Sequence, residues 1–309
     1  MKTKVKFKIA DVIIEMKSKS RFKPFTEEEA KHGEQHLSNF FYHGRQKPQI
    51  SIEVKVVDKL PQINITKHIF ASYHFQDRND HWRLLKQNNN YIYQCSRGQQ
   101  KQLMLVNKTL NRITAYLLPH KKEGNVWQKN DIITNFLQVF LINYFALHKN
   151  GIFVHGMAVK DLHGQSLLFA GESGCGKSTM AKLWHYNSKA MVLNDDRIVV
   201  RKHNANFYSH GLPWHGTFSA YLCSKIESAP LKKIFFIQHA PVHVVRRISQ
   251  KRAFELLYPA IFPTFWDKGC LENVASFSHD LIMSVPCYIL GFVNDKSVIE
   301  FVRQAAEKK

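Results

Sequence analysis

The stretch Gly171-Glu172-Ser173-Gly174-Cys175-Gly176-Lys177-Ser178 has the form G-x-x-x-x-G-K-S. Glycines in such a loop let consecutive backbone N–H groups turn inward, where they bind phosphate oxygens. The lysine of the motif reaches the β- and γ-phosphates of a nucleotide, and the serine hydroxyl can bind Mg²⁺. The stretch therefore predicts a phosphate-binding loop whose nucleotide-binding residues are Gly171, Ser173, Gly174, Cys175, Gly176, Lys177, Ser178 and Thr179.

The residues on both sides of this motif fit its usual place between a strand and a helix. The apolar run Ser166–Ala170 predicts a buried strand, and Ser178–Trp184 is compatible with a helix. Such a helix would direct the positive end of its dipole at a bound phosphate. The alternative, an incidental glycine-rich turn, does not explain why a lysine and a serine stand at these two places.

A pair of acidic residues gives the second signal, 18 residues after Lys177. The apolar stretch Met191–Leu193 leads through Asn194 to Asp195 and Asp196. One carboxylate can hold Mg²⁺, directly or through water, and the other can accept a proton from an attacking hydroxyl. Because neighbouring carboxylates repel, we expect one of them to have a raised proton affinity. The alternative is an acidic turn at the end of a strand.

The rest of the chain suggests two domains. Residues 1–127 carry short alternating segments separated by turn signals, which predict a β-rich domain built as an antiparallel meander or a sandwich. The expected strands are Ser51–Val57, His68–Phe75, Asn90–Ser96, Leu103–Val106 and Arg112–Leu118. Residues 128–309 predict an α/β nucleotide-binding domain, with strands at Ile152–Val159, Ser166–Ala170 and Ala190–Leu193 around the loop and its helix.

The uncharged, largely apolar run Ile132–His148 is too short and too polar for a membrane span. Its apolar residues follow helical spacing, so we expect a core helix there.

The basic N-terminus lacks the features of a signal peptide. Five cysteines without zinc-ligand spacing predict reduced thiols and a cytoplasmic location.

The chain of 309 residues is strongly basic, with 44 Lys and Arg against 24 Asp and Glu and a formal net charge of +20. Residues 1–150 hold 25 of the basic and 12 of the acidic residues, a net charge of +13. Such a surface attracts anions, so the N-terminal domain is a candidate for docking nucleic acid or an acidic partner. A solvated lysine-rich face without a dedicated partner is the other interpretation.

The combination of His155-Gly156, the phosphate loop and Asp195-Asp196, in this order and spacing, resembles the catalytic domain of HPr kinase/phosphorylase, which is related in fold to phosphoenolpyruvate carboxykinase. From about residue 130 onward the chain resembles more closely the HPr-kinase-like serine kinases, including those that phosphorylate lasso-peptide precursors. Five segments carry this second likeness: Leu193–Arg197, Gly211–Gly216, Ala229–Phe236, Phe265-Trp266-Asp267 and Val285-Pro286.

The resemblance implies a P-loop kinase fold of the HPr kinase and carboxykinase type, and it implies roles for single residues. Asp195 would be the general base toward the acceptor hydroxyl, and His155 would contact that carboxylate. Asp196 and Ser178 would hold Mg²⁺, and Lys177 would bind the transferred phosphoryl group. Thr179 stands where HPr kinases have an acidic residue, and Thr217 where the related serine kinases tend to have Glu. The segment used for phosphorolysis has no counterpart, so a reverse phosphorylase activity is not expected.

The expected activity is therefore an ATP- and Mg²⁺-dependent kinase that acts on a serine-like hydroxyl of a peptide, a protein or a small molecule. ATP, GTP and pyrophosphate all remain open as donors, because a phosphate loop binds phosphates and not the base. The resemblance also implies a homo-oligomer. The competing hypothesis is a non-catalytic nucleotide-binding regulatory module whose basic N-terminal domain docks nucleic acid or an acidic partner. A carboxykinase is a weaker third reading.

Overall fold

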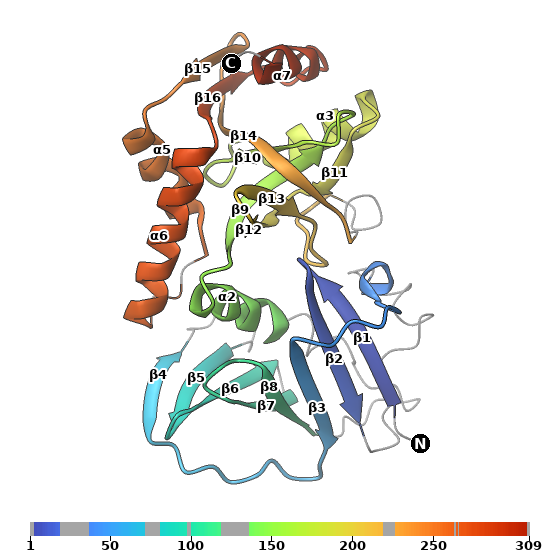
Figure 1. The fold of residues 1–309 in the computed structure, drawn as a ribbon, viewed down its shortest axis with the longest axis vertical. Coiled ribbons are helices and arrows are strands. Elements are labelled where there is room, and N and C mark those ends of the chain that lie inside the picture. The colour runs from blue at the N-terminus through green and yellow to red at the C-terminus, as the bar shows by residue number, and fades with distance from the viewer. Residues whose placement is uncertain are drawn as a thin grey trace. The chain divides into compact units, whose positions relative to one another are not determined.

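The computed structural model describes residues 3–18, 37–71, 81–97, 100–118, 136–218, 226–262, 264 and 266–307 (Figure 1). The chain divides into two compact units, Met1–Gly33 with Phe40–Phe140 and Glu34–Asn39 with Leu141–Lys309. The fold is mixed α/β and contains two eight-stranded sheets. The boundary predicted between residues 127 and 128 falls outside the described residues and stays a prediction.

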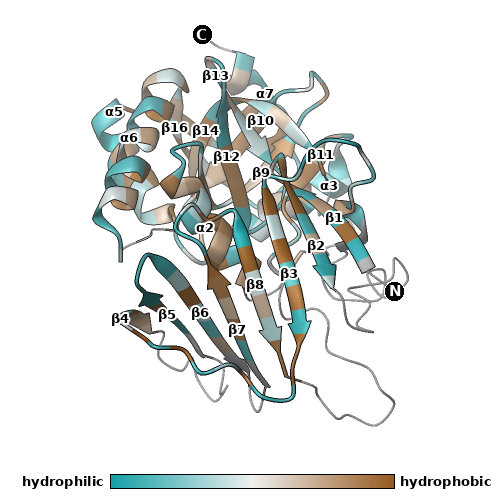
Figure 2. Ribbon diagram, turned by 60° about the horizontal axis from the view of Figure 1, so that its bottom comes forward, coloured by the Kyte–Doolittle hydropathy of each residue, from teal (hydrophilic) through white to brown (hydrophobic). Residues whose placement is uncertain are grey.

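The N-terminal unit is one sheet with the strand order β1-β2-β3-β8-β7-β6-β5-β4. Its strands are β1 (Thr3–Ile9), β2 (Val12–Ser18), β3 (Ile50–Val56), β4 (Lys67–Ala71), β5 (His81–Gln87), β6 (Asn90–Arg97), β7 (Gln100–Val106) and β8 (Arg112–Leu117). The short helix η1 (Leu37–Phe40) begins in the segment Glu34–Asn39, which groups with the second unit. Hydrophobic and hydrophilic residues alternate along β3, as Figure 2 shows, because one face of this strand is buried.

The predicted meander is confirmed from β4 to β8, where each strand pairs antiparallel with the next. The prediction is wrong for β3, which pairs parallel with both β2 and β8. The eight strands of the described part lie in one sheet, so within that part the alternative of a sandwich is also wrong. Sequence reasoning missed β1, β2 and β5. A two-residue turn joins β1 and β2, and Ala10 and Asp11 both have positive φ there, as tight hairpins require.

The C-terminal unit contains the loop 171–178 and the strands and helices around it. Its elements are α2 (Gln138–Leu147), β9 (Gly151–Lys160), β10 (Ser166–Ala170), α3 (Lys177–Asn187), β11 (Met191–Asn194), β12 (Arg197–His203), β13 (Asn206–His210), β14 (Ser228–His239), β15 (Val244–Arg247), α5 (Gln250–Leu257), η3 (Tyr258–Ala260), α6 (Lys268–Ser284), β16 (Cys287–Phe292) and α7 (Ser297–Glu307). The predicted strands and helix around the phosphate loop are confirmed. The expected core helix forms as α2, and residues 132–135 lie outside the described part.

The long strand β9 is shared by three neighbours. Its first half pairs with β12, and its second half lies between β10 and β11. The registers place His155 opposite Arg197 and Gly156 opposite Ala170. A Cβ atom at Gly156 would lie 2.9 Å from the Phe169 carbonyl oxygen, so the backbones approach closely there. The ends of β10 and β11 therefore meet beside the middle of β9.

Two apolar layers cover the sheet of this unit. Leu168 and Ala170 of β10 belong to a core cluster with residues of α5 and α6, whereas Leu167 and Phe169 belong to a cluster with residues of α3 and α7. Figure 1 shows α5 and α6 together along one side of the unit. Burial on both faces explains why the apolar residues of β10 are consecutive instead of alternating with polar ones.

The four cysteines in the described part, Cys95, Cys175, Cys270 and Cys287, are free thiols. This agrees with the prediction of reduced thiols. Burial raises the pKa of the Cys287 thiol to about 12, so it stays protonated at neutral pH. A search of the described residues found no helix with the length and apolar character needed to cross a membrane.

Candidate functional site

The loop between β10 and α3 has a backbone that depends on its glycines. Gly174 and Gly176 have φ values of 83° and 102°, a region that residues with a Cβ atom rarely adopt. A Cβ atom at Gly176 would also lie 2.7 Å from Cζ of Phe292. The conformation of the loop and the packing beneath it thus both require glycine at this position, directly before the first residue of α3.

Lys177 is folded back across this loop. Its Nζ donates hydrogen bonds to the carbonyl oxygens of Gly171 at 2.9 Å and Glu172 at 2.8 Å, and lies 3.7 Å from Sγ of Cys175. The side chain is buried, and these partners are neutral groups. The loop therefore holds one positive charge close to its own backbone, while Ser173 and Gly174 are exposed.

Asp195 is the carboxylate that the structure brings to the phosphate loop. It is only 1% exposed, and its Oδ2 lies 3.4 Å from the hydroxyl of Ser178, within hydrogen-bonding distance. The backbone N–H of Gly216 donates to Oδ1 at 2.8 Å, and that of Phe218 donates to Oδ2 at 2.9 Å. The buried acid is thus held by the segment around Gly216 and faces the first turn of α3.

Asp196 has a different environment. It is partly exposed, and its carboxylate lies 3.1 Å from Nδ1 of His155 and 3.3 Å from Nε of Arg197. Burial raises the pKa of Asp196, but the hydrogen bond from His155 and the positive charges of Arg197 and Lys177 outweigh it, so this pKa lies below its usual value. Repulsion between the two carboxylates was expected to raise the proton affinity of one of them. The pKa of Asp196 is instead lowered by the positive groups around it.

The predicted partner of His155 is wrong. His155 was expected against Asp195, and the structure pairs it with Asp196 instead. The register explains the difference, because His155 lies opposite Arg197 on β12, next to Asp196 in the chain. The backbone N–H of Gly156 also donates to the carbonyl oxygen of Asp196 at 3.0 Å.

Asn194 is a residue of the site that sequence reasoning missed. Its side chain is fully buried, and its amide donates to the carbonyl oxygens of Leu212 and Trp214 at 3.1 and 2.7 Å. Its Oδ1 accepts from the backbone N–H groups of Asp196 and Arg197. Asn194 therefore joins the acid-bearing turn to the segment that holds Asp195. An amide at the end of an otherwise apolar strand was the signal that could have revealed it.

Two segments that resemble the kinase family have structural roles in this chain. Trp214 is buried beside Phe153, with ring centroids 6.4 Å apart, so it belongs to the core. The carboxylate of Asp267 caps α6 by accepting from the N–H of Cys270 at 2.9 Å. Phe262 does lie at the site, since Arg197 stands 5.8 Å over its ring and His155 meets it edge-on at 6.2 Å.

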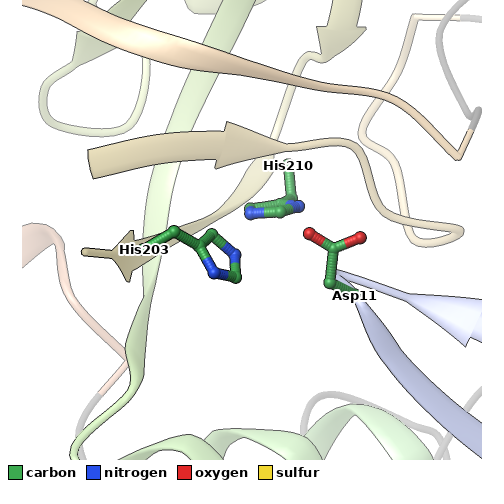
Figure 3. Close-up of side chains that lie close together, drawn as sticks. All are labelled: Asp11, His203 and His210. Carbon is green, nitrogen blue, oxygen red and sulfur yellow. The ribbon is translucent and has the colours of Figure 1, made fainter. Parts of the chain in front are cut away.

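The strands β12 and β13 bring two further histidines together. The ring centroids of His203 and His210 are 6.1 Å apart, and Figure 3 shows both side chains. Asp11, which the same figure labels, belongs to the N-terminal unit and is described with that unit. We assign no ligand to this histidine pair.

The chain can be compared with known proteins. No curated protein matches the chain. Among solved structures, the Hpr(Ser) kinase/phosphatase from Coxiella burnetii matches with 11% sequence identity and a TM-score of 0.28, over 50% of this chain and 94% of that chain. This similarity is too low to assign a fold or an activity. A family model described as "SynChlorMet cassette protein ScmC" matches residues 122–294, which is more than half of the chain. These residues span the phosphate loop, the acid pair and the strands that position them, and the chain belongs to this family.

Proposed function

We propose that this chain is a kinase that transfers the γ-phosphoryl group of Mg²⁺-bound ATP to a hydroxyl group. One observation carries the proposal: the Ser178 hydroxyl at the start of α3 lies 3.4 Å from the Asp195 carboxylate at the end of β11. The loop 171–178, whose sequence predicts phosphate binding, and an acid pair separated from it in sequence thus meet at one place. Phosphoryl transfer depends mainly on positioning and on neutralising charge, and both are available here.

The described residues fit a magnesium ion. Mg²⁺ prefers oxygen ligands and usually takes one or two carboxylates together with substrate phosphates. The Ser178 hydroxyl and the carboxylates of Asp195 and Asp196 form such a set of oxygen donors, and no sulfur or imidazole ligand is needed. When bound, the ion would neutralise charge on the β- and γ-phosphates. Ser178 and Asp196 are the ligands that the family resemblance implies.

The reaction follows from these positions. The acceptor oxygen attacks the γ-phosphorus, the bond from that phosphorus to the β–γ bridging oxygen breaks, and ADP leaves with the electron pair. Lys177 exchanges its two loop carbonyls for phosphate oxygens and compensates the charge that develops on them. The proton of the acceptor hydroxyl passes to a carboxylate of the acid pair.

Which carboxylate takes the proton is a separate point. The resemblance assigns this role to Asp195, with Asp196 on the metal. The environments favour the reverse order, because Asp195 is enclosed by the N–H groups of Gly216 and Phe218, whereas Asp196 is more exposed and lies beside His155. Asp196 would then face the acceptor, and Asp195 would face Ser178 and the ion.

The test is phosphoryl transfer from radiolabelled ATP to a panel of hydroxyl acceptors, namely serine- and threonine-containing peptides, free serine and small polyols. The wild-type protein should label at least one acceptor, and Lys177→Ala, Asp195→Asn and Asp196→Asn should not. Lys182→Ala removes an exposed lysine from the same helix and serves as the matched control. Labelling by Lys177→Ala at the wild-type rate would contradict the proposal.

The competing hypothesis of a regulatory module needs a free basic surface on the N-terminal unit. The lysines of β1 have partners within that unit: Lys4 pairs with Glu15 at 2.6 Å, Lys8 pairs with Asp11 at 2.8 Å, and Lys6 donates to the carbonyl oxygens of Gly44 and Gln46. These contacts weigh against β1 as a docking surface. Salt-sensitive nucleic-acid binding unaffected by Lys177→Ala, together with absent phosphoryl transfer, would favour the module.

A further inference from the structure

The phosphate loop stands at one edge of the C-terminal sheet, and other chain segments share that edge. The strands β10, β14 and β16 are parallel, and each pairs with the next. Their carboxyl ends therefore lie on the same side of the sheet, where ligands of open α/β sheets bind. The phosphate loop follows β10, residues 240–243 follow β14, and residues 293–296 follow β16.

The order of the strands indicates to which side of the loop the nucleoside of a bound triphosphate extends. The strand β11, which Asp195 directly follows, lies on one side of β10, two strands away through β9. The strands β14 and β16 lie on the other side. On the proposed function, on which this inference rests, the reacting phosphate lies between Lys177, Ser178 and Asp195. The nucleoside must then extend from the loop toward the segments that follow β14 and β16.

The end of β14 is in direct contact with the phosphate loop. The ring of His239 lies with Nε2 3.1 Å from the Gly174 carbonyl oxygen, and it stacks on Phe292 with centroids 5.8 Å apart and planes inclined by 27°. Phe292 is the residue whose ring closes the space beside Gly176. The ends of β14 and β16 therefore form the wall of the loop on the side away from the acid pair.

Beyond His239, the chain presents apolar side chains to solvent. Val242 is 65% exposed and Val244 is 49% exposed. Both are among the few large apolar side chains in the described part that are this exposed, and they lie two residues apart. The Val244 side chain packs over Gly291, where a Cβ atom would lie 2.9 Å from it, so this segment also lies next to Phe292.

The segment with Val242 is held in place by His243. Nδ1 of His243 accepts from the backbone N–H of Val293 at 3.2 Å, so the ring proton is on Nε2, which donates to the Ser297 hydroxyl at 2.8 Å. Ser297 in turn donates to Asp295. The backbone N–H of Ala240 also bonds to the Phe292 carbonyl oxygen. The two segments that follow β14 and β16 are thus tied together before any ligand binds, which lowers the cost of ordering a site.

We propose that residues 239–244 and 293–296 are the nucleoside-binding part of the donor site, and that the exposed side chain of Val242 contacts a purine base. The phosphate loop binds only the phosphates, so this surface supplies the preference for a nucleotide over an inorganic polyphosphate. Apolar contact with the flat base removes Val242 from water, which is the favourable contribution.

The experiment compares the binding of Mg²⁺–ATP with the binding of Mg²⁺–tripolyphosphate, measured by isothermal titration calorimetry on the full chain. Val242→Ser removes the apolar surface without adding charge, and it leaves the core unchanged because Val242 is exposed. Leu162→Ser is the matched control, because Leu162 is 60% exposed in the turn at the opposite end of β10. Wild type and Leu162→Ser should bind ATP more tightly than tripolyphosphate, and Val242→Ser should weaken ATP binding by about fivefold with tripolyphosphate unchanged.

The outcomes separate this inference from the proposed function. If the protein binds ATP and Val242→Ser binds it as tightly as wild type, the nucleoside surface is overturned and the kinase proposal stands. Equal weakening of both ligands by Val242→Ser would also overturn it, because the residue would then act on the phosphates. Failure of wild type to bind either ligand would overturn both proposals. An azidoadenine analogue of ATP should label peptides that contain residues 239–246 or 293–297, and labelling confined to residues 136–165 would contradict the assignment.

Discussion

Gly216 lies so close to Asp195 that a residue with a side chain does not fit at position 216. Its backbone N–H donates to Oδ1 of Asp195 at 2.8 Å, and a Cβ atom at Gly216 would lie 2.8 Å from Oδ2 and 3.0 Å from Cβ of Asp196. The position of the buried acid is therefore set by a glycine 21 residues further along the chain.

The substitution Gly216→Ala should move Asp195 away from Ser178. The added methyl group forces the carboxylate or the 216–218 backbone to shift, and the hydrogen bonds to Asp195 lengthen. We expect phosphoryl transfer to fall by about 100-fold, since misplaced catalytic groups are costly. The transfer assay described above measures it. Gly269→Ala, in the first turn of α6, is the control and should leave transfer unchanged, because a Cβ atom there would meet nothing closer than 3.4 Å.

The substitution Asn194→Asp should destabilise the C-terminal unit. An aspartate can still accept from the N–H groups of Asp196 and Arg197, but it cannot donate to the Leu212 and Trp214 carbonyl oxygens. A buried carboxylate facing two carbonyl oxygens costs on the order of 3 kcal/mol. Urea unfolding followed by circular dichroism gives this free energy. The exposed Asn187→Asp should change it by less than about 0.5 kcal/mol, and equal effects of the two variants would contradict the role of Asn194.

The pair Asp161–Arg303 should make stability depend on pH. Burial raises the pKa of Asp161, but two hydrogen bonds from Arg303, at 2.7 and 3.1 Å, the backbone N–H of Leu162 and nearby positive charge lower it further, so the folded pKa lies below its ordinary value. A depressed carboxyl pKa stabilises the fold above the unfolded pKa of about 3.9, and this contribution disappears as pH falls through the folded pKa. We expect Asp161→Asn to cost about 2 kcal/mol at pH 7 and much less near pH 2.

The measurement for Asp161→Asn is the free energy of unfolding of wild type and variant at several pH values. Glu255→Gln, which breaks the exposed pair with Arg252, is the control and should shift stability by less than about 1 kcal/mol. A difference between wild type and Asp161→Asn that stays constant from pH 7 to pH 2 would show that the ion pair is not its source.

The substitution Phe292→Ala should weaken the phosphate loop as well as the core. The buried ring packs against Gly176 and stacks with His239, so its removal leaves a cavity under the loop. The expected loss of stability is about 3 to 5 kcal/mol, and binding of Mg²⁺–tripolyphosphate should also fall. Phe277→Ala, in α6 within the other core cluster, should cost similar stability without a specific effect on polyphosphate binding. If both variants keep wild-type affinity when folded, Phe292 has no role in supporting the loop.

The parts of the fold that sequence predicted are those fixed by neighbouring residues. The strand at 166–170, the loop and α3 follow from a contiguous motif, and Asp195 and Asp196 follow at the end of the next strand. The sequence analysis placed Ser178 with Asp196 on Mg²⁺, whereas the contact in the structure is between Ser178 and Asp195. The roles of these residues remain proposals.

The parts that sequence did not predict depend on distant pairing. Nothing near His155 indicates that its register with β12 places it against Asp196. The parallel pairing of β3 with β2 and β8 is set by strands far from it in sequence. Trp214 lies in the segment Gly211–Gly216, which carries part of the family resemblance, yet it packs on Phe153 in the core. The cytoplasmic location and the homo-oligomer stay predictions.

The shared strand β9 has a consequence for how the family can vary. The loop strand, the acid strand and the strand after the acids all take their register from β9. The pairing with β12 places His155 beside the turn that carries Asp196, while the loop before α3 positions Lys177 and the 216–218 segment holds Asp195. Insertions in outer turns can lengthen the chain freely, whereas a single added residue inside β9 would rotate His155 to the opposite face and disconnect it from the acids.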